Sequence, residues 1–426
     1  MSQVLEAQPR TPMIDGERLW RRIMTMAEVG ATGRGGVDRQ TLTQADTRGR
    51  QLFLDWVAER GYEASMDAVG NLFVRRPGTD PDLAPVMTGS HLDTQPTGGN
   101  FDGVYGVLAG LEVMETLDDH GVATARPIDL VVWLNEEGTR FPPTTMGSAV
   151  YAGALELASV LQTRDAAGVS VEQALAEQID ALPKLAGHAL GEPAYAYIEN
   201  HIEQGPVLEN EGLSVGIVNG IQGLRQLSVS IQGQEAHAGT TPPSARRDAL
   251  LTATHMIQSF GALVSERGDD RVRLTVGRLN VYPNAPNTIP AYVNFTVDLR
   301  HPEDEILAGL NERVQAICDA QQSPCTINAE EVFRSPGVSF DANVLAALQR
   351  ACEGQGIAGR EMMSGATHDA KFMARLGPAA MIFVPCENGL SHNEAENADA
   401  VDLAAGTRVL AQALHELAVR RGPLND

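Results

Sequence analysis

The sequence predicts an α/β protein in which a larger domain, built on a mixed sheet with helices on both faces, is interrupted by a smaller α+β domain. Three observations lead to this prediction. The chain has 426 residues, more than a single hydrophobic core usually serves. Short apolar runs of strand length alternate with helical patterns toward both ends of the chain. The middle of the chain instead contains strand patterns with one polar face.

The apolar runs of the larger domain have the length of buried strands and stop at polar, glycine or proline residues. Helical patterns lie between them; residues 104–121, for instance, end on a glycine, as helices often do. Strands that are apolar on both sides and alternate with helices are typical of a sheet that is covered on both faces. The predicted strands are residues 71–76, 84–90, 128–137, 194–201 and 379–386.

The middle of the chain alternates apolar and polar residues in three segments, LRQLSVSIQG, RVRLTVGRLNV and AYVNFTVDLR. Two helical stretches, RRDALLTATHMIQSFGALVSERG and EDEILAGLNERVQAICDA, lie between or after them. The order strand, helix, strand, strand, helix predicts a small α+β domain inserted into the larger one. We place this domain at residues 218–330, so that residues 1–217 and 331–426 together form the larger domain.

The composition excludes several classes of function. With 32 basic and 55 acidic residues the net charge is −23, which repels nucleic acid and anionic membranes. No window approaches 18 uninterrupted apolar residues, and the start, MSQVLEAQPR, lacks the layout of a secretory signal. The cysteines show no CxxC spacing, which favours free thiols in a reducing cytoplasm. They are Cys318, Cys325, Cys352 and Cys386.

Polar residues with the chemistry of metal ligands follow four of the predicted strands. Because open α/β sheets gather ligands and catalytic groups at the carboxyl ends of their strands, we expect these residues to lie close together. Imidazole and carboxylate groups together suit Zn²⁺ or a similar divalent ion. The residues are His91, Asp93 and Asp102 in GSHLDTQPTGGNFDG, Glu136 and Glu137 after IDLVVWLN, His201 after AYAYIEN, and His392 and Glu394 after AAMIFVPC.

Such a set of residues fits a pair of divalent ions. An aspartate can bridge two ions with its two oxygens, and two ions about 3.5 Å apart can hold a hydroxide nucleophile between them. Of the adjacent Glu136 and Glu137, one can bind an ion while the other moves protons. Asp93, two residues after His91, can accept the second imidazole N–H and fix the orientation of the ring.

Seven motifs resemble those of one known family, in the same order along the chain. They are similar to the amidase branch of the M20 metallopeptidase-like hydrolases, which includes N-carbamoyl-L-amino-acid hydrolases, β-ureidopropionases and allantoate or ureidoglycolate amidohydrolases. The resemblance runs from roughly residue 20 to residue 420. The motifs are GSHLDTQPTGGNFDG, WLNEEGTRF, YIENHIEQGPVLE, GQEAHAGTTP, NTIPAYVNFTVDLRHP, SGATHDA and FVPCENGLSHNEAE.

The resemblance implies a metal-binding catalytic domain with an inserted ferredoxin-like lid or dimerisation domain, and hence a homodimer. Glu136 would be the general base and acid. The two ions could be Zn²⁺, Mn²⁺, Co²⁺ or Ni²⁺, because sites of histidine and carboxylate accept each of them according to supply. The implied ligands are His91 and His201 for one ion, Glu137 and His392 for the other, and Asp102 as the bridge between them.

Four further residues resemble substrate-binding positions of this family. Arg300 in DLRHP can grip a carboxylate, and Asn287 in NTIP can add a neutral hydrogen bond. His237 in EAHAGTTP can stabilise the oxyanion that forms when a carbonyl is attacked. Gln204, in HIEQG, resembles another position that contacts the substrate.

We therefore expect a binuclear metal-dependent amidohydrolase that cleaves the ureido C–N bond of an N-carbamoyl amino acid to the amino acid, ammonia and CO₂.

Thr367 in SGATHDA and the polar stretch FPPTTMGS depart from the family pattern, and His368 and Asp369 are candidates only to support the pocket. Allantoate or ureidoglycolate is an alternative substrate. An aminoacylase or dipeptidase is less favoured, because peptidase members place a carboxylate where this chain has His201. A non-catalytic binding protein would lack a ligand or the base, and the sequence lacks neither.

Overall fold

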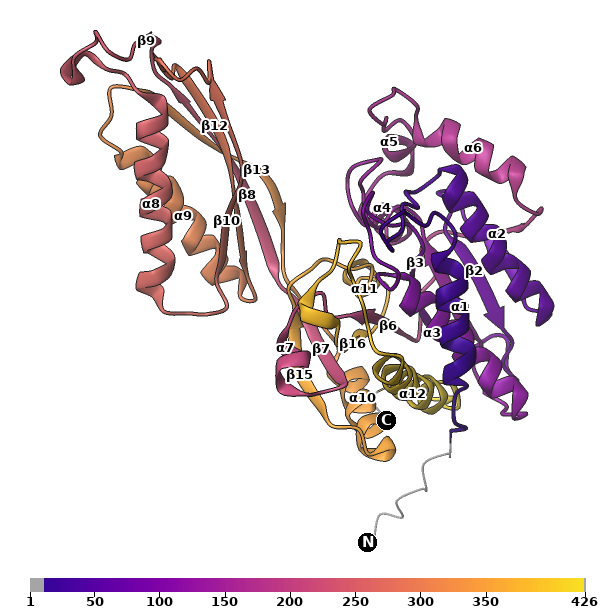
Figure 1. Cartoon of the computed structure of the whole chain (residues 1–426). Helices are drawn as coiled ribbons and strands as arrows, with labels where there is room; N and C mark the ends of the chain where they lie inside the picture. The colour runs from indigo at the N-terminus through magenta and orange to yellow at the C-terminus, as the bar shows by residue number, and fades with distance from the viewer. Residues whose placement is uncertain (1–10, 425–426) are drawn as a thin grey trace, which may run out of the picture. The chain divides into compact units, whose positions relative to one another are not determined.

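The computed structural model describes residues 11–424, which form two compact units (Figure 1). Unit 1 contains the chain up to Asn219 and from Phe340 onward, and unit 2 contains Gly220–Ser339. The start of the chain, which we interpreted as lacking a secretory signal, lies outside the described residues. Within residues 11–424, no helix is long and apolar enough to cross a membrane. All four cysteines are free.

Unit 1 is built on one large mixed sheet. Its strands are β1 (Glu63–Met66), β2 (Leu72–Arg76), β3 (Val86–His91), β4 (Ile128–Trp133), β5 (Ala186–Gly187), β6 (Ala196–Ile202), β7 (Val215–Ile221), β15 (Gly359–Ser364) and β16 (Ala379–Val384). They follow the order β7-β16-β6-β3-β4-β2-β1-β5, and β15 pairs with β7. The four central strands, β16, β6, β3 and β4, run parallel. Every residue of these four strands is buried, which explains why their sequences are apolar on both sides.

Helices cover both faces of this sheet, as predicted. Gly110 of α3 lies against the side chain of Leu130 on one face of β4. The next residue, Val131, points to the opposite face and pairs with Phe73, whose ring lies 5.3 Å from that of Tyr151 in α4. The helices of unit 1 are α1 (Gly16–Ala27), α2 (Gln44–Glu59), α3 (Val104–Asp119), α4 (Met146–Tyr151), α5 (Leu157–Leu161), α6 (Val171–Ala181), α7 (Val207–Glu211), α10 (Ala342–Gln355), α11 (Ala370–Met373) and α12 (Ala400–Ala418).

Strand β4 ends earlier than the sequence predicted. We expected it to reach residue 137, but it ends at Trp133. The chain leaves the strand because Asn135 has a φ of +54° and its side-chain amide donates to the carbonyl of Phe141 at 2.6 Å. Glu136 and Glu137 therefore lie in a loop rather than on the strand.

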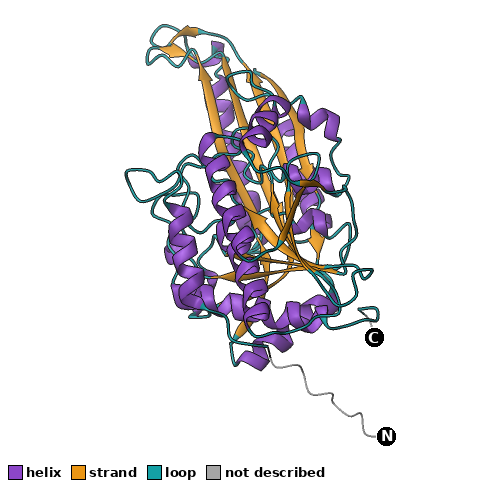
Figure 2. Ribbon diagram, turned by 90° about the vertical axis from the view of Figure 1, so that its right-hand side faces the viewer, coloured by secondary structure: helices purple, strands orange, loops and turns teal. Residues whose placement is uncertain are grey.

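Unit 2 has the ferredoxin-like order of elements, strand-helix-strand-strand-helix-strand. Its four long strands form an antiparallel sheet in the order β10-β12-β8-β13, and they run side by side in Figure 2. Helices α8 and α9 pack together against this sheet (Figure 1). The elements are β8 (Gly223–Gln232), β9 (Ala236–His237), α8 (Ala249–Arg267), β10 (Arg273–Tyr282), β11 (Thr288–Ile289), β12 (Tyr292–His301), α9 (Asp304–Ala320), β13 (Thr326–Ser335) and β14 (Val338–Ser339).

The domain boundaries expected at residues 218 and 330 both fall inside strands. Residue 218 lies within β7 of the large sheet, and residue 330 lies within β13. Sequence analysis did not identify β13, because a β-bulge between Glu331 and Phe333 interrupts its alternation. At the bulge, Val332 is 53% exposed and Phe333 is 44% exposed, so the sequence of this strand lacks the regular alternation that marks one buried apolar face.

Candidate active site

The parallel strands bring two predicted histidines together. His91 is the last residue of β3, and His201 is the last but one of β6, the strand beside it. The parallel register pairs Thr88 with Ile198, and continuing it by three residues sets His91 level with His201. The two rings lie 5.9 Å apart between centroids, and both side chains are 1% exposed.

Asp102 completes a first group of three possible ligands with these histidines. Its Oδ1 lies 3.1 Å from Nε2 of His201 and 3.8 Å from Nε2 of His91. The glycine-rich loop makes this approach possible. Gly103 has a φ of +68°, and a Cβ at this position would lie 2.3 Å from the His91 ring. Only glycine fits there, so the loop can fold back against His91.

The other oxygen of Asp102 belongs to a second group, with Glu137 and His392. Nε2 of His392 lies 3.3 Å from Asp102 Oδ2 and 3.4 Å from Glu137 Oε2. The structure thus brings together all five residues for which the resemblance implies metal binding, with one oxygen of Asp102 in each group. Such an arrangement suits two divalent ions.

The second ring nitrogens of the two buried histidines are held by backbone carbonyls. Nδ1 of His91 lies 2.9 Å from the carbonyl oxygen of Asp93, and Nδ1 of His201 lies 2.9 Å from that of Ile202. A carbonyl accepts only, so each Nδ1 carries a proton and each Nε2 faces Asp102. Nε2 of His201 is buried, and Oδ1 of Asp102, 3.1 Å away, can be its partner only when the ring is protonated. In the neutral ring this nitrogen has no partner, and a metal ion fits as the one that is missing.

The expected role of Asp93 needs a correction. Its carboxylate lies 3.8 Å from His91 Nδ1, too far for the hydrogen bond that we predicted, and its backbone carbonyl makes that bond instead. The carboxylate accepts the backbone N–H groups of Glu136 at 3.3 Å and of Glu137 at 3.2 Å. The backbone carbonyl of Asp93 thus orients the ring of His91, and its side-chain carboxylate holds the backbone of Glu136 and Glu137.

Glu136 lies beside the first group of ligands without belonging to it. Its Oε2 is 3.7 Å from Nε2 of His91, and the residue is 8% exposed. Burial, together with the nearby carboxylates of Asp369 and Glu137, raises the pKa of Glu136 well above its usual value. A buried carboxyl of raised pKa next to ligand positions can accept and return a proton.

The pKa values of the carboxyl groups of the site are shifted in opposite directions. Burial alone would raise the pKa of Asp102, but hydrogen bonds and charge from His201 and His392 hold it well below its usual value. Burial and the charge of Asp102 raise the pKa of Glu137 to about 8. Burial raises the pKa of Asp93 to about 7. A cation at the site would relieve this crowding of carboxylates, because it favours their ionised forms.

Gln204, predicted to contact the substrate, points its amide at the second group. Its Nε2 lies 3.1 Å from Asp102 Oδ2 and 3.1 Å from the hydroxyl of Ser391. On the other side, Nε2 of Gln95, which sequence analysis did not single out, donates to Glu137 Oε2 at 2.6 Å. Both amides therefore satisfy carboxylate oxygens of the candidate ligands.

Two buried carboxylates that sequence analysis overlooked make hydrogen bonds to different segments of the site. Glu199 accepts the hydroxyl of Ser90 at 2.8 Å and the backbone N–H of Ala370 at 2.9 Å. Glu396 accepts the backbone N–H of Asp102 at 3.1 Å. The signal for Glu199 is an acidic residue inside a strand that was predicted to be buried, and Glu396 is the last residue of the motif FVPCENGLSHNEAE.

The two pocket candidates of SGATHDA are also buried in unit 1. The ring of His368 lies 4.5 Å from that of His201 between centroids, and its Nε2 lies 3.1 Å from the hydroxyl of Ser364. Asp369 accepts the hydroxyl of Ser148 through Oδ1. Both residues are thus buried in unit 1 without belonging to either group of candidate ligands.

In unit 2 the predicted substrate residues fall into two places. His237 of β9 pairs with Thr288 of β11, and the backbone N–H of Ala238 donates to the carbonyl of Asn287 at 3.0 Å. Arg300 lies near the other end of β12 and pairs with Asp298 at 2.9 Å. The eight residue-to-residue steps from Tyr292, at the start of β12, to Arg300 span about 26 Å at roughly 3.3 Å per residue. Within one unit 2, His237 and Arg300 cannot contact the same small molecule.

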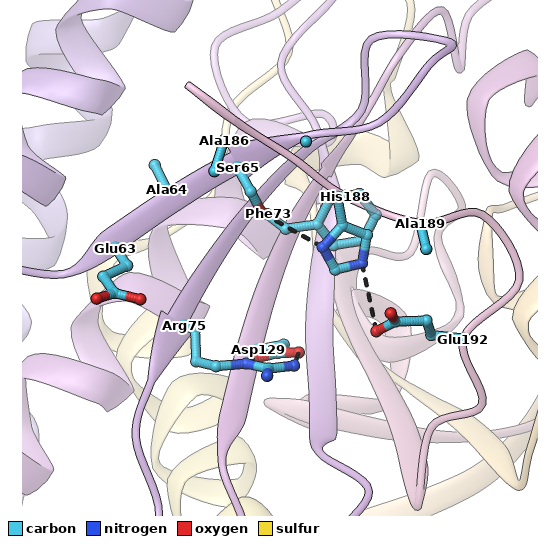
Figure 3. Close-up of a pocket in the computed structure, with 11 residues that line it drawn as sticks. Glu63, Ala64, Ser65, Phe73, Arg75, Asp129, Ala186, His188, Ala189 and Glu192 are labelled. Atoms are coloured by element: carbon cyan, nitrogen blue, oxygen red, sulfur yellow. Dashed lines mark hydrogen bonds and ion pairs between the residues drawn. The ribbon is translucent and has the colours of Figure 1, made fainter. Parts of the chain in front are cut away.

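A cavity of about 510 Å³ opens at the β1–β5 edge of unit 1, away from the candidate ligands (Figure 3). The ring of His188 stacks on Phe73 at 3.7 Å, and Arg75 pairs with Asp129 at 2.6 Å. The polar groups in Figure 3 largely satisfy one another, and the residues that line this cavity include no predicted ligand or substrate residue.

Residues 87–416 match the model of a known family, described as peptidase family M20/M25/M40. The chain belongs to the M20/M25/M40 family. The matched segment contains both groups of candidate ligands, Glu136 and the whole of unit 2. The M20 assignment agrees with histidine and carboxylate side chains that could hold metal ions.

Relatives place the chain within the amidase branch of the M20 family. The N-carbamoyl-L-amino-acid amidohydrolase of Rhizobium meliloti is 41% identical over 95% of this chain and 97% of its own. The allantoate amidohydrolase of Bacillus subtilis is 34% identical over 92% and 95%, respectively. The crystal structure of an amidase of the hydantoinase/carbamoylase family from Burkholderia multivorans matches with a TM-score of 0.88, at 43% identity and over 96% and 99% of the two chains. These similarities confirm the predicted branch and the fold class.

Proposed function

We propose that this protein hydrolyses the ureido C–N bond of an N-carbamoyl amino acid and releases the amino acid, ammonia and CO₂. The observation that carries the proposal is the pair of ligand groups that share Asp102, with the buried Glu136 beside them. The Rhizobium and Bacillus relatives, which are named as amidohydrolases of N-carbamoyl-L-amino acids and of allantoate, support the same class of bond.

Two divalent ions, Zn²⁺ or Mn²⁺, Co²⁺ or Ni²⁺ according to supply, would be held by His91, His201 and Asp102 and by Asp102, Glu137 and His392. When bound, they supply a Lewis acid for the carbonyl and lower the pKa of a water molecule. Glu136 takes the proton that the attacking water loses and delivers it to the departing nitrogen. The bound cations would keep its resting form ionised, and its burial, which raises the pKa, favours uptake of the proton and its retention between the two steps.

The residues of unit 2 would bind the rest of the substrate. Arg300 offers a guanidinium for the α-carboxylate, while His237 and Asn287 stabilise the oxyanion and add a neutral hydrogen bond. Gln204 would turn from Asp102 to the substrate. Since about 26 Å of β12 separate the ends that carry these groups, we propose that the two ends serve different active sites in a homodimer.

The sheet of unit 2 supports the proposal of a homodimer. Strand β10 is at its edge, where Leu279 is 46% exposed and Tyr282 is 61% exposed. An edge strand with exposed apolar side chains is a ready surface for pairing with a second chain.

The four free cysteines fit a reducing compartment, and we place the protein in the cytoplasm.

Allantoate or ureidoglycolate remains a second candidate substrate, because the allantoate amidohydrolase of Bacillus subtilis is 34% identical to this chain. Both kinds of substrate carry a carboxylate for Arg300. An assay of ammonia release with N-carbamoyl-α-amino acids, N-carbamoyl-β-alanine, allantoate, ureidoglycolate and an N-acetyl amino acid distinguishes them. We expect the highest kcat/KM for an N-carbamoyl-α-amino acid; preference for the N-acetyl substrate would contradict the proposal.

A further inference from the structure

The carboxylate of Glu396 joins the two loops that carry Asp102 and His392. Its Oε1 accepts the backbone N–H groups of Phe101 at 3.0 Å and of Asp102 at 3.1 Å. Its Oε2 accepts the hydroxyl of Ser391, the residue before His392, at 2.9 Å. The residue is 3% exposed, so water competes little for these bonds.

The loop opposite Glu396 is shaped to receive it. A Cβ at Gly99 would lie 2.2 Å from Oε1 of Glu396, so only glycine leaves room for the carboxylate. Burying a carboxylate is costly unless hydrogen bonds compensate for the lost water. Here three donors offset part of that cost, and burial still raises the pKa of Glu396 to about 7. The contact spans 294 residues of sequence between Glu396 and Asp102.

We propose that Glu396 is a positioning residue that sets the distance between Asp102 and His392 and so assembles the ligand group of Asp102, Glu137 and His392. This inference rests on the proposed two-metal function.

The two halves of the site depend on Glu396 to different degrees. His91 and His201 belong to the buried strands β3 and β6, which hold their backbones through sheet hydrogen bonds. His392 lies in a loop with a φ of +54°, and its side chain is 48% exposed. The position of His392 therefore depends on the contacts of its loop. The hydroxyl of the preceding Ser391 lies 2.9 Å from Oε2 of Glu396, its shortest contact, 3.1 Å from Nε2 of Gln204 and 3.3 Å from Oδ2 of Asp102.

Glu394 provides a matched control in the same loop. Its carboxylate accepts the hydroxyl of Thr32 at 2.6 Å and pairs with Arg34 at 2.7 Å. Replacing Glu394 with alanine removes the same side-chain atoms as replacing Glu396. It leaves the bonds to Asp102 and Ser391 in place.

The test compares the wild-type protein with Glu396→Ala, Glu396→Gln and Glu394→Ala. Each full-length protein is stripped of metal and equilibrated with graded free Zn²⁺. Bound ions are counted by elemental analysis, and circular dichroism checks the fold. We expect two ions in the wild type, and in Glu396→Ala an unchanged first ion with a second bound about 10- to 100-fold more weakly. Glu396→Gln should recover most of the second affinity, because its carbonyl oxygen can accept both backbone N–H groups. Glu394→Ala should match the wild type.

Equal affinity for the second ion in wild type and folded Glu396→Ala would overturn the inference, as would equal weakening of both ions or the same loss in Glu394→Ala. If Glu396→Ala does not fold, Glu396→Asp, whose shorter side chain withdraws the carboxylate from Phe101 and Asp102, replaces it; a weaker second ion supports the inference and an unchanged one overturns it. A wild-type protein that binds fewer than two ions contradicts the proposed two-metal function instead.

Discussion

Oε2 of Glu136 lies 3.7 Å from Nε2 of His91, and Glu136 nevertheless belongs to neither group of candidate ligands. The neighbouring Glu137 is in the second group, although both backbone N–H groups are held by the same carboxylate of Asp93. One aspartate thus holds two adjacent glutamates at different places in the site. In the proposed mechanism this arrangement would separate metal binding from proton transfer.

Glu136→Gln should therefore abolish most of the activity without loss of metal. Glutamine keeps the shape of the side chain but cannot accept the proton, and general acid–base catalysis contributes about 10²- to 10⁴-fold. The measurements are kcat and the number of bound ions. Glu192→Gln, half exposed in the cavity of Figure 3, is the control and should keep full activity. Near-wild-type turnover of Glu136→Gln would show that another group moves the proton.

Substitution of Asp102 should differ from that of His392 in its effect on metal content. Asp102→Ala removes an oxygen from both ligand groups, whereas His392→Ala removes a ligand from only one. We expect Asp102→Ala to weaken both ions, and His392→Ala to weaken the second while the first is retained. Isothermal titration with Zn²⁺ measures both affinities. Identical losses in the two variants would argue against Asp102 as a bridge.

The thermal stability of the metal-free protein should fall as the pH rises from 7 to 9. The pKa values of Asp93 and Glu137 are raised to about 7 and about 8, and that of His201 to about 9. Burial is the leading cause for the two acids. For His201 burial opposes the rise, and the Asp102 carboxylate, which accepts a hydrogen bond from the protonated ring and carries a negative charge, causes it. In each case the folded protein binds a proton that the unfolded chain releases. The stabilisation from that proton is present at lower pH and is lost as the pH rises through the pKa of the group in the folded protein.

Metal should remove this trend, because a bound cation keeps its ligands deprotonated and binds more tightly as the pH rises. The measurement is Tm across this range with chelator and with excess Zn²⁺. A Tm of the metal-free protein that rises toward pH 9 would contradict the assigned protonation of the site.

Mixing two inactive variants tests the proposed homodimer. If His237 acts on the partner's site and Arg300 on its own, a mixed dimer of His237→Ala and Arg300→Ala contains one intact site and one site with neither residue. Random exchange makes about half of the dimers mixed, so roughly a quarter of the wild-type activity should return. The readout is ammonia release after exchange of subunits. Mixtures that stay as inactive as the separate variants would place both residues in one subunit's site.

The region of the candidate ligands could be predicted because a parallel sheet brings the loops after its strands to one edge, and the family resemblance selected the five ligands among the polar residues of those loops. His91 and His201 belong to strands whose apolar runs are plain in the sequence, and the register of β3 and β6 sets them level. Asp102 could be placed near them because the glycines of its loop let the chain turn back.

The supporting residues could not be predicted in the same way. Glu396 meets Asp102 across 294 residues, and nothing in the local sequence of either loop specifies that contact. Asp93 was identified but given the wrong partner, because sequence spacing does not tell a side-chain oxygen from a backbone one. The bulge in β13 hid a strand, and so the expected boundary of the inserted domain fell at residue 330 rather than after Ser339.

The most direct test of the two-metal amidohydrolase is stepwise reconstitution of the metal-free protein with Zn²⁺ or Mn²⁺, with ammonia release from an N-carbamoyl-α-amino acid measured at each addition. We predict no turnover without metal and a rise that levels off at two equivalents of ion per chain. Full turnover of the metal-free protein, or a plateau at one equivalent, would contradict the account.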